Sequence, residues 1–310
     1  MTRLTPAVLR GMWAGLPVPW TEKDEIDEEA LRENVRRICR AGAPGVYTHG
    51  TTGEFYAQTA EEWKRVAKAT VEECRASGTP TQVGCTALYT GEVIRRVAFA
   101  QESGADGVQI AFPFWMEVTD SQAVRFLKEV TTAVPGMPVI IYNTGRSKKP
   151  LTADFLKRIV EAGIPVVGCK GARNPEELQA LLAAAPQVKF FVGEPDLAGW
   201  WKFGARGCYS SFIYACPRFM LRYTGLCERV DPEAQTIARG LQQLIADYVV
   251  PRYQKGMYDT AFDRIFTTAT GFLTGKLLLS RGPYDSPTAK DVEDFRAWCA
   301  QKLPQFIEEI

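Results

Sequence analysis

The sequence predicts an α/β protein, a (β/α)8 (TIM) barrel with a C-terminal helical extension. Over the first two thirds of the chain, short apolar runs alternate with stretches of helical periodicity. There are eight such runs, spaced roughly 20 to 35 residues apart, which fits a closed barrel of parallel strands better than an open doubly wound sheet. After about Thr224 the strand signals stop and only helical patterns continue.

The predicted strands and the helices between them follow in strict alternation. Asp27 and Thr59 each precede an amphipathic stretch as helix N-caps, and Asn174 precedes Pro175 at a first helical position. Glycines such as Gly163 follow several helices, where a C-cap is expected. The eight predicted strands are Gly11–Pro17, Gly45–His49, Thr81–Thr86, Gly107–Phe112, Pro138–Asn143, Pro165–Lys170, Val188–Gly193 and Gly207–Phe212.

We expect the chain to have two parts, a catalytic barrel over residues 1–228 and a three-helix extension over residues 229–310. The helices predicted for the extension cover residues 231–248, 261–279 and 289–310. No linker, internal repeat or low-complexity segment separates the two parts.

The composition and charge point to small-molecule chemistry. Hydrophobic residues make up 46% of the chain and charged residues 24%, with a formal net charge of +1. This balance gives no electrostatic reason to bind nucleic acid or an anionic membrane. No window approaches the roughly 18 consecutive apolar residues of a spanning helix, and residues 1–10 lack the apolar core of a signal peptide. We therefore expect a cytoplasmic protein with no nucleic-acid or membrane partner.

The cysteines and the histidine argue against disulfide and metal chemistry. Eight cysteines are scattered without a CxxC pair, as small buried hydrophobes in a reducing compartment would be. His49 is the only histidine, whereas metal-dependent aldolases and hydrolases usually use two or three imidazoles. The sequence contains neither a Walker loop nor a GxGxxG after a strand. We therefore expect no metal and no cofactor.

Lys170 stands at the end of the sixth predicted strand, where a buried parallel strand would ordinarily stay apolar. A lysine walled by Val167 and Cys169 loses hydration, which disfavours its ammonium form. A neutral lysine is a nucleophile. The alternative is a strand-end lysine whose ammonium group simply reaches water.

Other strand ends carry residues that favour the first interpretation, because a barrel of this kind places its reactive groups there. Gly50-Thr51-Thr52-Gly53-Glu54 after the second strand is a tight turn whose amides and hydroxyls can face a small anion such as a carboxylate. Tyr142 ends the fifth strand and could exchange a proton across the barrel mouth from Lys170. Gly193 and the segment Tyr209–Ser211 end the last two strands and are suited to lining a pocket.

These motifs resemble one family. GTTGE after strand two, Tyr142-Asn143 after strand five, and Gly168 two residues before Lys170 look like the dihydrodipicolinate synthase and N-acetylneuraminate lyase family over the whole chain. The resemblance implies a cofactor-free class I lyase or aldolase that forms a Schiff base with 2-keto acids. It also implies a homotetramer, a dimer of dimers.

The resemblance also implies roles for individual residues. Lys170 would form the Schiff base, Tyr142 would transfer protons, and Thr51 and Thr52 would bind the keto-acid carboxylate. The resulting iminium draws electrons from the neighbouring carbon, so a bond at that carbon can break. The catalytic candidates are Lys170, Tyr142 and Thr52, and the substrate-binding candidates are Gly50, Thr51, Thr52, Trp115, Arg146, Gly193, Tyr209 and Ser211.

Two stretches depart from the synthase pattern. Where synthases carry a loop tyrosine that reaches the neighbouring subunit, this chain has Phe114 and Trp115, which cannot relay a proton. This apolar stretch is similar to the aromatic-substrate hydratase-aldolases of the same superfamily; alternatively, Trp115 packs in a subunit interface. The arginine expected five residues after Tyr142 is replaced by Ser147, with Arg146 one residue earlier. Arg146 either serves from a shorter loop or belongs to a solvated basic loop.

Tyr209 and His49 are also expected to lie close to the site. Tyr209 stands where synthases tend to carry an aliphatic residue and would narrow or polarise the pocket, and His49 is expected to support the turn rather than to catalyse. We predict a 2-keto acid aldolase or hydratase-aldolase that acts on pyruvate or a larger 2-keto acid together with an aldehyde. The alternatives are dihydrodipicolinate synthase proper, a keto-acid dehydratase or deaminase, and a noncatalytic keto-acid-binding barrel.

Overall fold

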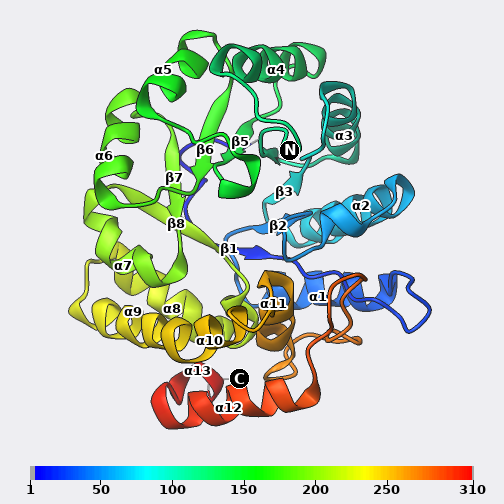
Figure 1. The fold of residues 1–310 in the computed structure, drawn as a ribbon, viewed down its shortest axis with the longest axis vertical. Coiled ribbons are helices and arrows are strands. Elements are labelled where there is room, and N and C mark those ends of the chain that lie inside the picture. Colours follow the sequence, from blue (N-terminus) through cyan, green and yellow to red (C-terminus); the bar gives the residue numbers. More distant parts are fainter. Residues whose placement is uncertain (1–3, 309–310) are drawn as a thin grey trace.

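A closed barrel of eight parallel strands, surrounded by helices, forms the body of the molecule in a computed structural model that describes residues 4–308 (Figure 1). The strands pair in chain order, and the last strand closes on the first. They are β1 (Gly11–Gly15), β2 (Val46–Thr48), β3 (Thr81–Gly84), β4 (Gly107–Ile110), β5 (Val139–Tyr142), β6 (Val166–Lys170), β7 (Lys189–Val192) and β8 (Ala205–Ser210). The predicted fold class is confirmed, and each predicted strand overlaps the observed one.

The helices of the barrel begin largely where the sequence predicts. Asp27 accepts a hydrogen bond from the Ala30 amide at 3.0 Å, and Thr59 forms a reciprocal capping box with Glu62. The helices are α1 (Glu28–Arg40), α2 (Ala60–Ser77), α3 (Thr90–Ser103), α4 (Asp120–Ala133), α5 (Ala153–Glu161), α6 (Pro175–Ala184), α7 (Leu197–Trp200) and α8 (Pro217–Glu228).

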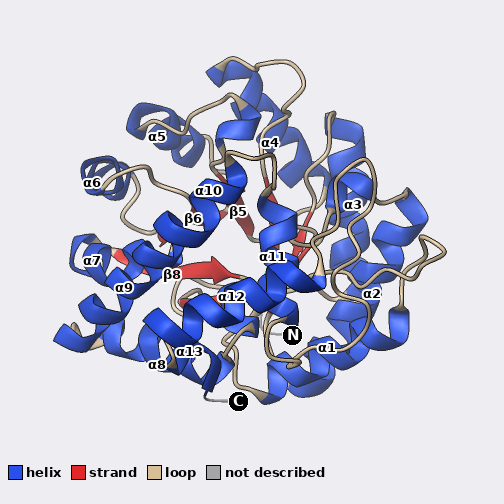
Figure 2. Cartoon of the chain, turned by 60° about the horizontal axis from the view of Figure 1, so that its bottom comes forward, coloured by secondary structure: helices blue, strands red, loops and turns tan. Residues whose placement is uncertain are grey.

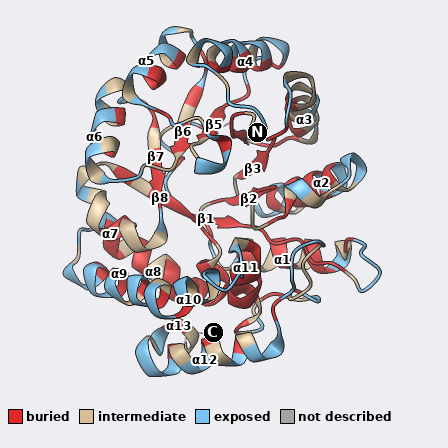
Figure 3. Ribbon diagram, viewed as in Figure 1, coloured by how far each residue is buried: buried red, intermediate tan, exposed pale blue. Residues whose placement is uncertain are grey.

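Two apolar regions stabilise the barrel. A large cluster fills the space between the strands and the surrounding helices, whose outer faces are exposed (Figure 3). A smaller cluster fills the barrel interior. Because side chains alternate along a strand, every second residue enters this interior. The interior cluster consists of Leu4, Leu9, Trp13, Tyr47, Ile140, Phe191 and Tyr209.

The C-terminal extension is helical: the first predicted helix continues beyond residue 248 to Tyr253, whereas the second and third end earlier than predicted. It contains α9 (Pro232–Leu244), α10 (Val250–Tyr253), α11 (Asp259–Thr268), α12 (Ala289–Lys302) and α13 (Gln305–Glu308). The last predicted helix is divided after Lys302, before Pro304, and its final residues, 309–310, lie outside the described residues, as do residues 1–3 of the predicted barrel. No helix within residues 4–308 combines the length and apolar character needed to cross a membrane.

Local chemistry explains the other two differences. After α9 the backbone makes a π-helical turn over Ile245–Val249, next to Pro251, which has no N–H to donate to a preceding carbonyl. The helix predicted to reach residue 279 ends at Thr268, and Gly271 then adopts a φ of 73°. The Asn34 side chain accepts a hydrogen bond from the Thr274 amide at 2.7 Å and so holds this non-helical segment against α1.

Helix α11 ties the extension to the barrel. Figure 2 shows α10 and α11 in front of the strands, and residues of both helices line the same cavity as Tyr142 at the end of β5. On the side facing β1 and β2, Arg264 of α11 forms a buried ion pair with Glu54 at 2.5 Å. The extension therefore contributes directly to the end of the barrel where the predicted site residues lie.

Candidate active site

The pairing register of β5 and β6 and the alternation of side chains along each strand bring Tyr142 and Lys170 together. Ile140 lies in the barrel interior, and Gly168 is its register partner on β6. Two residues further along each strand, Tyr142 and Lys170 are again register partners. Because alternate side chains of a strand share a face, both also point toward the barrel interior. Both side chains therefore project into the C-terminal mouth of the barrel.

A register shift and a glycine make this arrangement possible. Val139 pairs with Val166 but Ile140 pairs with Gly168, so β6 carries one extra residue at Val167, as in a β-bulge. A Cβ atom at Gly168 would lie 2.4 Å from a methyl carbon of Leu9 in the barrel interior. Gly168 therefore leaves space for the interior side chains directly beneath Lys170.

Lys170 and Tyr142 are coupled electrostatically. The Lys170 Nζ lies 4.3 Å from the centroid of the Tyr142 ring. The positive charge of Lys170 lowers the pKa of Tyr142 below its ordinary value, although burial of the phenol opposes this effect. Arg146 and a hydrogen bond with the Thr51 side chain lower the pKa further. This phenol gives up its proton more readily than an ordinary tyrosine, which suits a proton shuttle.

The GTTGE turn between β2 and α2 is tightly constrained. A Cβ atom at Gly50 would lie 2.5 Å from the ring of Tyr47, so this position has no room for a larger residue. Glu54 is fully buried and has a φ of 49°, in the left-handed region. Its carboxylate accepts hydrogen bonds from Trp20 and from Arg264. The hydrogen bond from Arg264 thereby connects the turn to the C-terminal extension.

Thr52 and Ser211 are brought together by a residue that the sequence analysis did not identify. Thr52 Oγ1 donates a hydrogen bond to Asp263 Oδ2 at 2.7 Å, and Ser211 Oγ donates to Asp263 Oδ1 at 2.6 Å. Asp263 belongs to α11, and burial raises its pKa to about 6, against the effect of the two hydrogen bonds. The single Thr52 hydroxyl hydrogen is thus directed at a carboxylate of the protein.

Tyr209 forms part of the floor of the site. Its ring centroid lies 5.4 Å from Lys170 Nζ, and its hydroxyl donates to Gln82 Oε1 at 2.7 Å in the barrel interior. Burial raises the pKa of Tyr209, so this phenol stays neutral. Its contribution at Lys170 is an aromatic surface rather than a free hydroxyl.

A cavity of about 590 Å³ opens over Tyr142. Phe114 lies in its wall, as do Gly50 and Thr51. Arg146 also reaches it and pairs with Asp259 of α11 at 2.6 Å. Most of the remaining wall is aromatic and comes partly from the extension. The tyrosines that line the cavity are Tyr47, Tyr56, Tyr142, Tyr253, Tyr258 and Tyr284.

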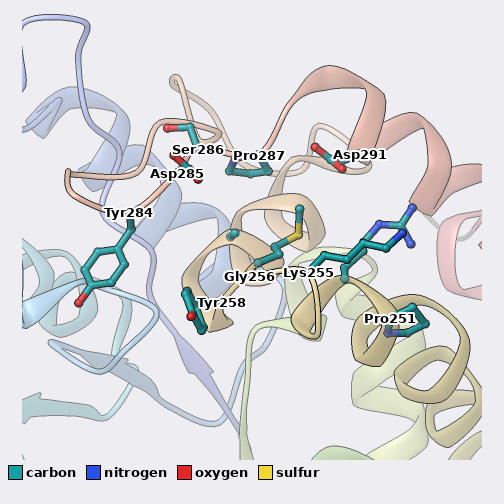
Figure 4. A pocket seen from close by; sticks show the side chains of 12 residues that line it. Pro251, Lys255, Gly256, Tyr258, Tyr284, Asp285, Ser286, Pro287 and Asp291 are labelled. Atoms are coloured by element: carbon teal, nitrogen blue, oxygen red, sulfur yellow. The ribbon is translucent and has the colours of Figure 1, made fainter.

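A second hollow, lined by residues of the C-terminal extension, adjoins this cavity. Figure 4 shows Tyr258 and Tyr284, which belong to the walls of both the cavity over Tyr142 and the second hollow of about 430 Å³. The labelled side chains Lys255 and Asp285 come from the loops on either side of this second hollow (Figure 4). The two aromatic side chains therefore stand between the two spaces.

Several predicted residues do not line the cavity wall: Lys170, Thr52, Tyr209 and Ser211, which are described above, and also Trp115, Gly193 and His49. Trp115 is 76% exposed and lines a separate surface hollow with Leu88 and Met116, so within one chain it does not reach the cavity over Tyr142. Gly193 is exposed at the end of β7. His49 is buried, its ring centroid lies 4.7 Å from that of Trp63 with the rings tilted by 33°, and its pKa is lowered to about 3, chiefly by burial. The expected support of the turn by His49 stays a prediction.

A second carboxyl group also lies near Lys170. Glu194, which follows β7, has its pKa raised by burial, while a hydrogen bond with Ser210 and the positive charge of Lys170 act in the opposite direction. Within residues 4–308 no cluster of His, Cys, Asp and Glu side chains has the composition of a metal site. The side chains gathered around Lys170 and Tyr142 provide an amine, phenols, hydroxyls and carboxyl groups.

Sequence reasoning missed Asp263 and Asp259 because both lie in the extension, away from any strand end. The available signal was two adjacent charges, Asp263 and Arg264, inside a stretch that is otherwise apolar on both sides. Charged residues are rarely buried without a partner. That pattern indicates partners elsewhere in the fold, although it does not identify them.

Comparison with known proteins agrees with the geometry. The model of the dihydrodipicolinate synthetase family matches residues 8–258. The 4-hydroxy-tetrahydrodipicolinate synthase of Thermus thermophilus is 34% identical over 193 residues, 61% of this chain and 64% of the relative. The trans-O-hydroxybenzylidenepyruvate hydratase-aldolase of Pseudomonas putida is 31% identical over 207 residues, 63% of this chain and 60% of the relative. The chain thus aligns with less than two thirds of the length of either protein.

Solved structures share the fold. A structure of PhdJ bound to a substrate intermediate has a TM-score of 0.84 at 22% identity and covers 99% of both chains. DHDPS from Cyanidioschyzon merolae with lysine bound has a TM-score of 0.85 at 18% identity, covering 98% of this chain and 99% of that one. Together with the strand-end motifs and the family match, this shows that the chain belongs to the dihydrodipicolinate synthetase family, whose members are Schiff-base-forming lyases and aldolases.

Proposed function

We propose that this protein is a class I aldolase or hydratase-aldolase that binds pyruvate or a larger 2-keto acid as a Schiff base on Lys170. The observation that carries the proposal is the pairing of Lys170 with Tyr142 on adjacent strand ends, with Nζ 4.3 Å from the phenol ring. A lysine amine and a tyrosine whose pKa is lowered, side by side at the mouth of a barrel, are the groups that this chemistry needs: Lys170 is the amine, and the lowered pKa is that of Tyr142.

The first step is formation of the Schiff base. The neutral Lys170 amine attacks the keto carbon and forms a carbinolamine, and loss of its hydroxyl group as water gives the iminium. Tyr142 supplies the proton that leaves with that water. The amides and the Thr51 hydroxyl of the GTTGE turn hold the substrate carboxylate, which fixes the keto carbon toward Lys170.

The second step is cleavage of the bond between the carbon adjacent to the iminium carbon and the next carbon, which bears a hydroxyl group. The electron pair of that bond moves into the iminium and gives an enamine, while the hydroxyl proton of the departing carbon passes to the Tyr142 phenolate. An aldehyde leaves. The enamine then takes a proton on carbon, and water hydrolyses the iminium to release the keto acid and the Lys170 amine.

The aldehyde side of the substrate is proposed to be apolar or aromatic. The cavity over Tyr142 is lined by Phe114 and by several tyrosines, and its volume of about 590 Å³ is that of a small-molecule site. Tyr56, Tyr258 and Tyr284 line this cavity, and aromatic side chains favour stacking with a flat group. These walls favour an aldolase or hydratase-aldolase over a synthase whose aldehyde carries a charged amino acid group.

Trapping of the Schiff base tests the proposed chemistry. The protein is incubated with pyruvate and borohydride, and the modified peptide is identified by mass spectrometry. We expect one irreversible adduct, on Lys170, and none in a Lys170→Met variant. An unchanged intact mass, or an adduct on a neighbouring lysine such as Lys148, would show that the mechanism is wrong.

The synthase alternative is tested with pyruvate and aspartate semialdehyde. We expect slow turnover, because Phe114 replaces a phenol in the loop after β4. Turnover with a panel of aromatic aldehydes, run in the condensation direction, is expected to be faster. Efficient synthase turnover together with no reaction on aromatic aldehydes would reverse this ranking.

We also propose that the protein acts as an oligomer, a homotetramer, in the cytoplasm. An exposed apolar patch surrounds a hollow of about 520 Å³ that is lined by Leu88, Tyr89, Trp115 and Met116, and a second copy of the chain would cover it. All eight cysteines are free and buried, as suits a reducing compartment. Light scattering should show dissociation of a Trp115→Glu variant but not of a Val230→Glu control; an unchanged mass for both variants would oppose this assignment.

A further inference from the structure

Asp263 occupies an unusual position for an anionic group. Its partly buried carboxyl accepts hydrogen bonds from Thr52 at 2.7 Å and from Ser211 at 2.6 Å, so both oxygens are engaged. Thr52 belongs to the turn that is proposed to hold the substrate carboxylate. A keto acid bound there would place a second carboxylate next to the first, with one threonine hydroxyl between them.

The charges that face Asp263 come from several elements. Lys170 on β6 favours the ionised form, whereas Asp259 on α11 favours the neutral form. Glu194 after β7 and Tyr214 after β8 also interact with the Asp263 charge, which raises the pKa of each of them. Only one of these groups is a cation. A second anion brought next to Asp263 is therefore not compensated by the neighbouring residues.

The Thr52 hydroxyl shows how the conflict can be resolved. A hydroxyl has one hydrogen to donate, and in the present structure Thr52 donates it to Asp263. It can donate to a substrate carboxylate only if it releases Asp263. A protonated Asp263 can donate to Thr52 Oγ1 instead, and Thr52 can then donate to the substrate.

We propose that Asp263 is a positioning residue that acts through Thr52, and that keto-acid binding is coupled to the uptake of one proton by Asp263. The inference rests on the proposed function, because it places a keto-acid carboxylate at the turn. One proton is taken from solvent, the Thr52 to Asp263 hydrogen bond reverses direction, and the Thr52 hydrogen passes to the substrate side. No covalent bond between heavy atoms changes.

The coupling has a direction that can be measured. Asp263 has a pKa raised to about 6, so it is ionised in the free protein above that pH. Each further pH unit makes the protonated, binding-competent form roughly tenfold rarer. The pyruvate concentration needed for half-maximal trapping on Lys170 should therefore rise by up to about tenfold per pH unit above pH 6.

The test compares the wild-type protein with Asp263→Asn between pH 6 and 8.5. The introduced amide accepts from Ser211 and donates to Thr52 without a proton from solvent, so it resembles the protonated acid. The ratio of their half-saturating pyruvate concentrations reports the loss of the Asp263 carboxyl group. Because Asp263 and Lys170 interact electrostatically, the pH dependence of Lys170 trapping at saturating pyruvate is recorded for both proteins and subtracted. We expect this ratio, wild type over variant, to rise at least tenfold across the range. Ser211→Ala, which keeps the acid, should retain the wild-type slope.

The outcomes separate the two proposals. Adducts on Lys170 with parallel pH profiles in wild type and Asp263→Asn would overturn the proton coupling and leave the Schiff-base function intact. Failure to trap Lys170 in any variant would overturn both. If Asp263→Asn does not fold, calorimetry of pyruvate binding to Lys170→Met at pH 8, in two buffers of different ionisation enthalpy, counts the protons directly. Uptake approaching one proton supports the coupling, and none refutes it.

Discussion

Glu54 offers a sharp test of how the extension is joined to the barrel. Its side chain and that of Arg264 are 0% and 1% exposed, and their charged atoms lie 2.5 Å apart. A Glu54→Gln substitution leaves the Arg264 guanidinium buried without a counter-charge. Removing one partner of a buried ion pair costs about 3–5 kcal/mol of folding free energy, because the remaining charge is not solvated. We expect Glu54→Gln to destabilise the protein by this amount.

Calorimetry or denaturant unfolding measures the effect. With about 2.1 cal/mol/K of unfolding entropy per residue, a chain of this length loses about 1.5 °C in midpoint per kcal/mol, so the expected decrease is about 5–8 °C. The matched control is Glu228→Gln, which breaks the exposed pair with Arg10 at 3.1 Å and should cost less than about 1 kcal/mol. Equal losses in the two variants would refute the reasoning. Replacing both Glu54 and Arg264 by apolar residues should recover much of the loss.

Three further predictions concern the site and its support. Tyr142→Phe should reduce turnover by roughly 10²–10⁴-fold while pyruvate still binds, as single-turnover kinetics would show, because the shuttle phenol is lost; a smaller effect would assign the proton to another group. Gly50→Ala should lower the free energy of unfolding by about 1–3 kcal/mol and weaken pyruvate binding, because the new Cβ atom would lie 2.5 Å from the Tyr47 ring. In the control Gly145→Ala the new Cβ atom meets nothing within 4 Å, so pyruvate binding should not change. The pKa of His49 is about 3 in the folded protein, whereas an unfolded histidine takes up a proton near pH 6.5. The free energy of unfolding should therefore fall by up to about 1.4 kcal/mol per pH unit on acidification below pH 6.5. A His49→Asn variant should lack this component, and an identical pH slope in the two proteins would contradict the assignment.

The barrel could be predicted from the sequence because its signals are local. Each strand is a short apolar run, and the rule that reactive groups stand at strand ends selects Lys170 and Tyr142 without knowledge of the packing. Their spacing could not be predicted in the same way. It depends on the register shift between Val139 and Ile140, which no residue pattern in the sequence marks.

The partner of Thr52 could not be predicted from the residues around it in the sequence. The turn chemistry predicts hydroxyls and amides that face a small anion, and in the structure the Thr52 hydroxyl donates to Asp263, which lies 211 residues away in the sequence. Only the packing of α11 over the barrel mouth brings the two together. The same holds for the tyrosines of the cavity that come from residues 253–284, which no strand-end rule includes.

The connection between α11 and the GTTGE turn links stability to chemistry. Asp263 and Arg264 are consecutive residues, about 100° apart around the helix, and they contact Thr52 and Glu54 respectively. A movement of α11 would therefore disturb both contacts at once and shift the turn that is proposed to hold the substrate carboxylate. The barrel supplies the amine and the phenol, while the extension sets the position of the turn and the charge beside it. Variation in the extension can thus change keto-acid binding without any change at Lys170 or Tyr142.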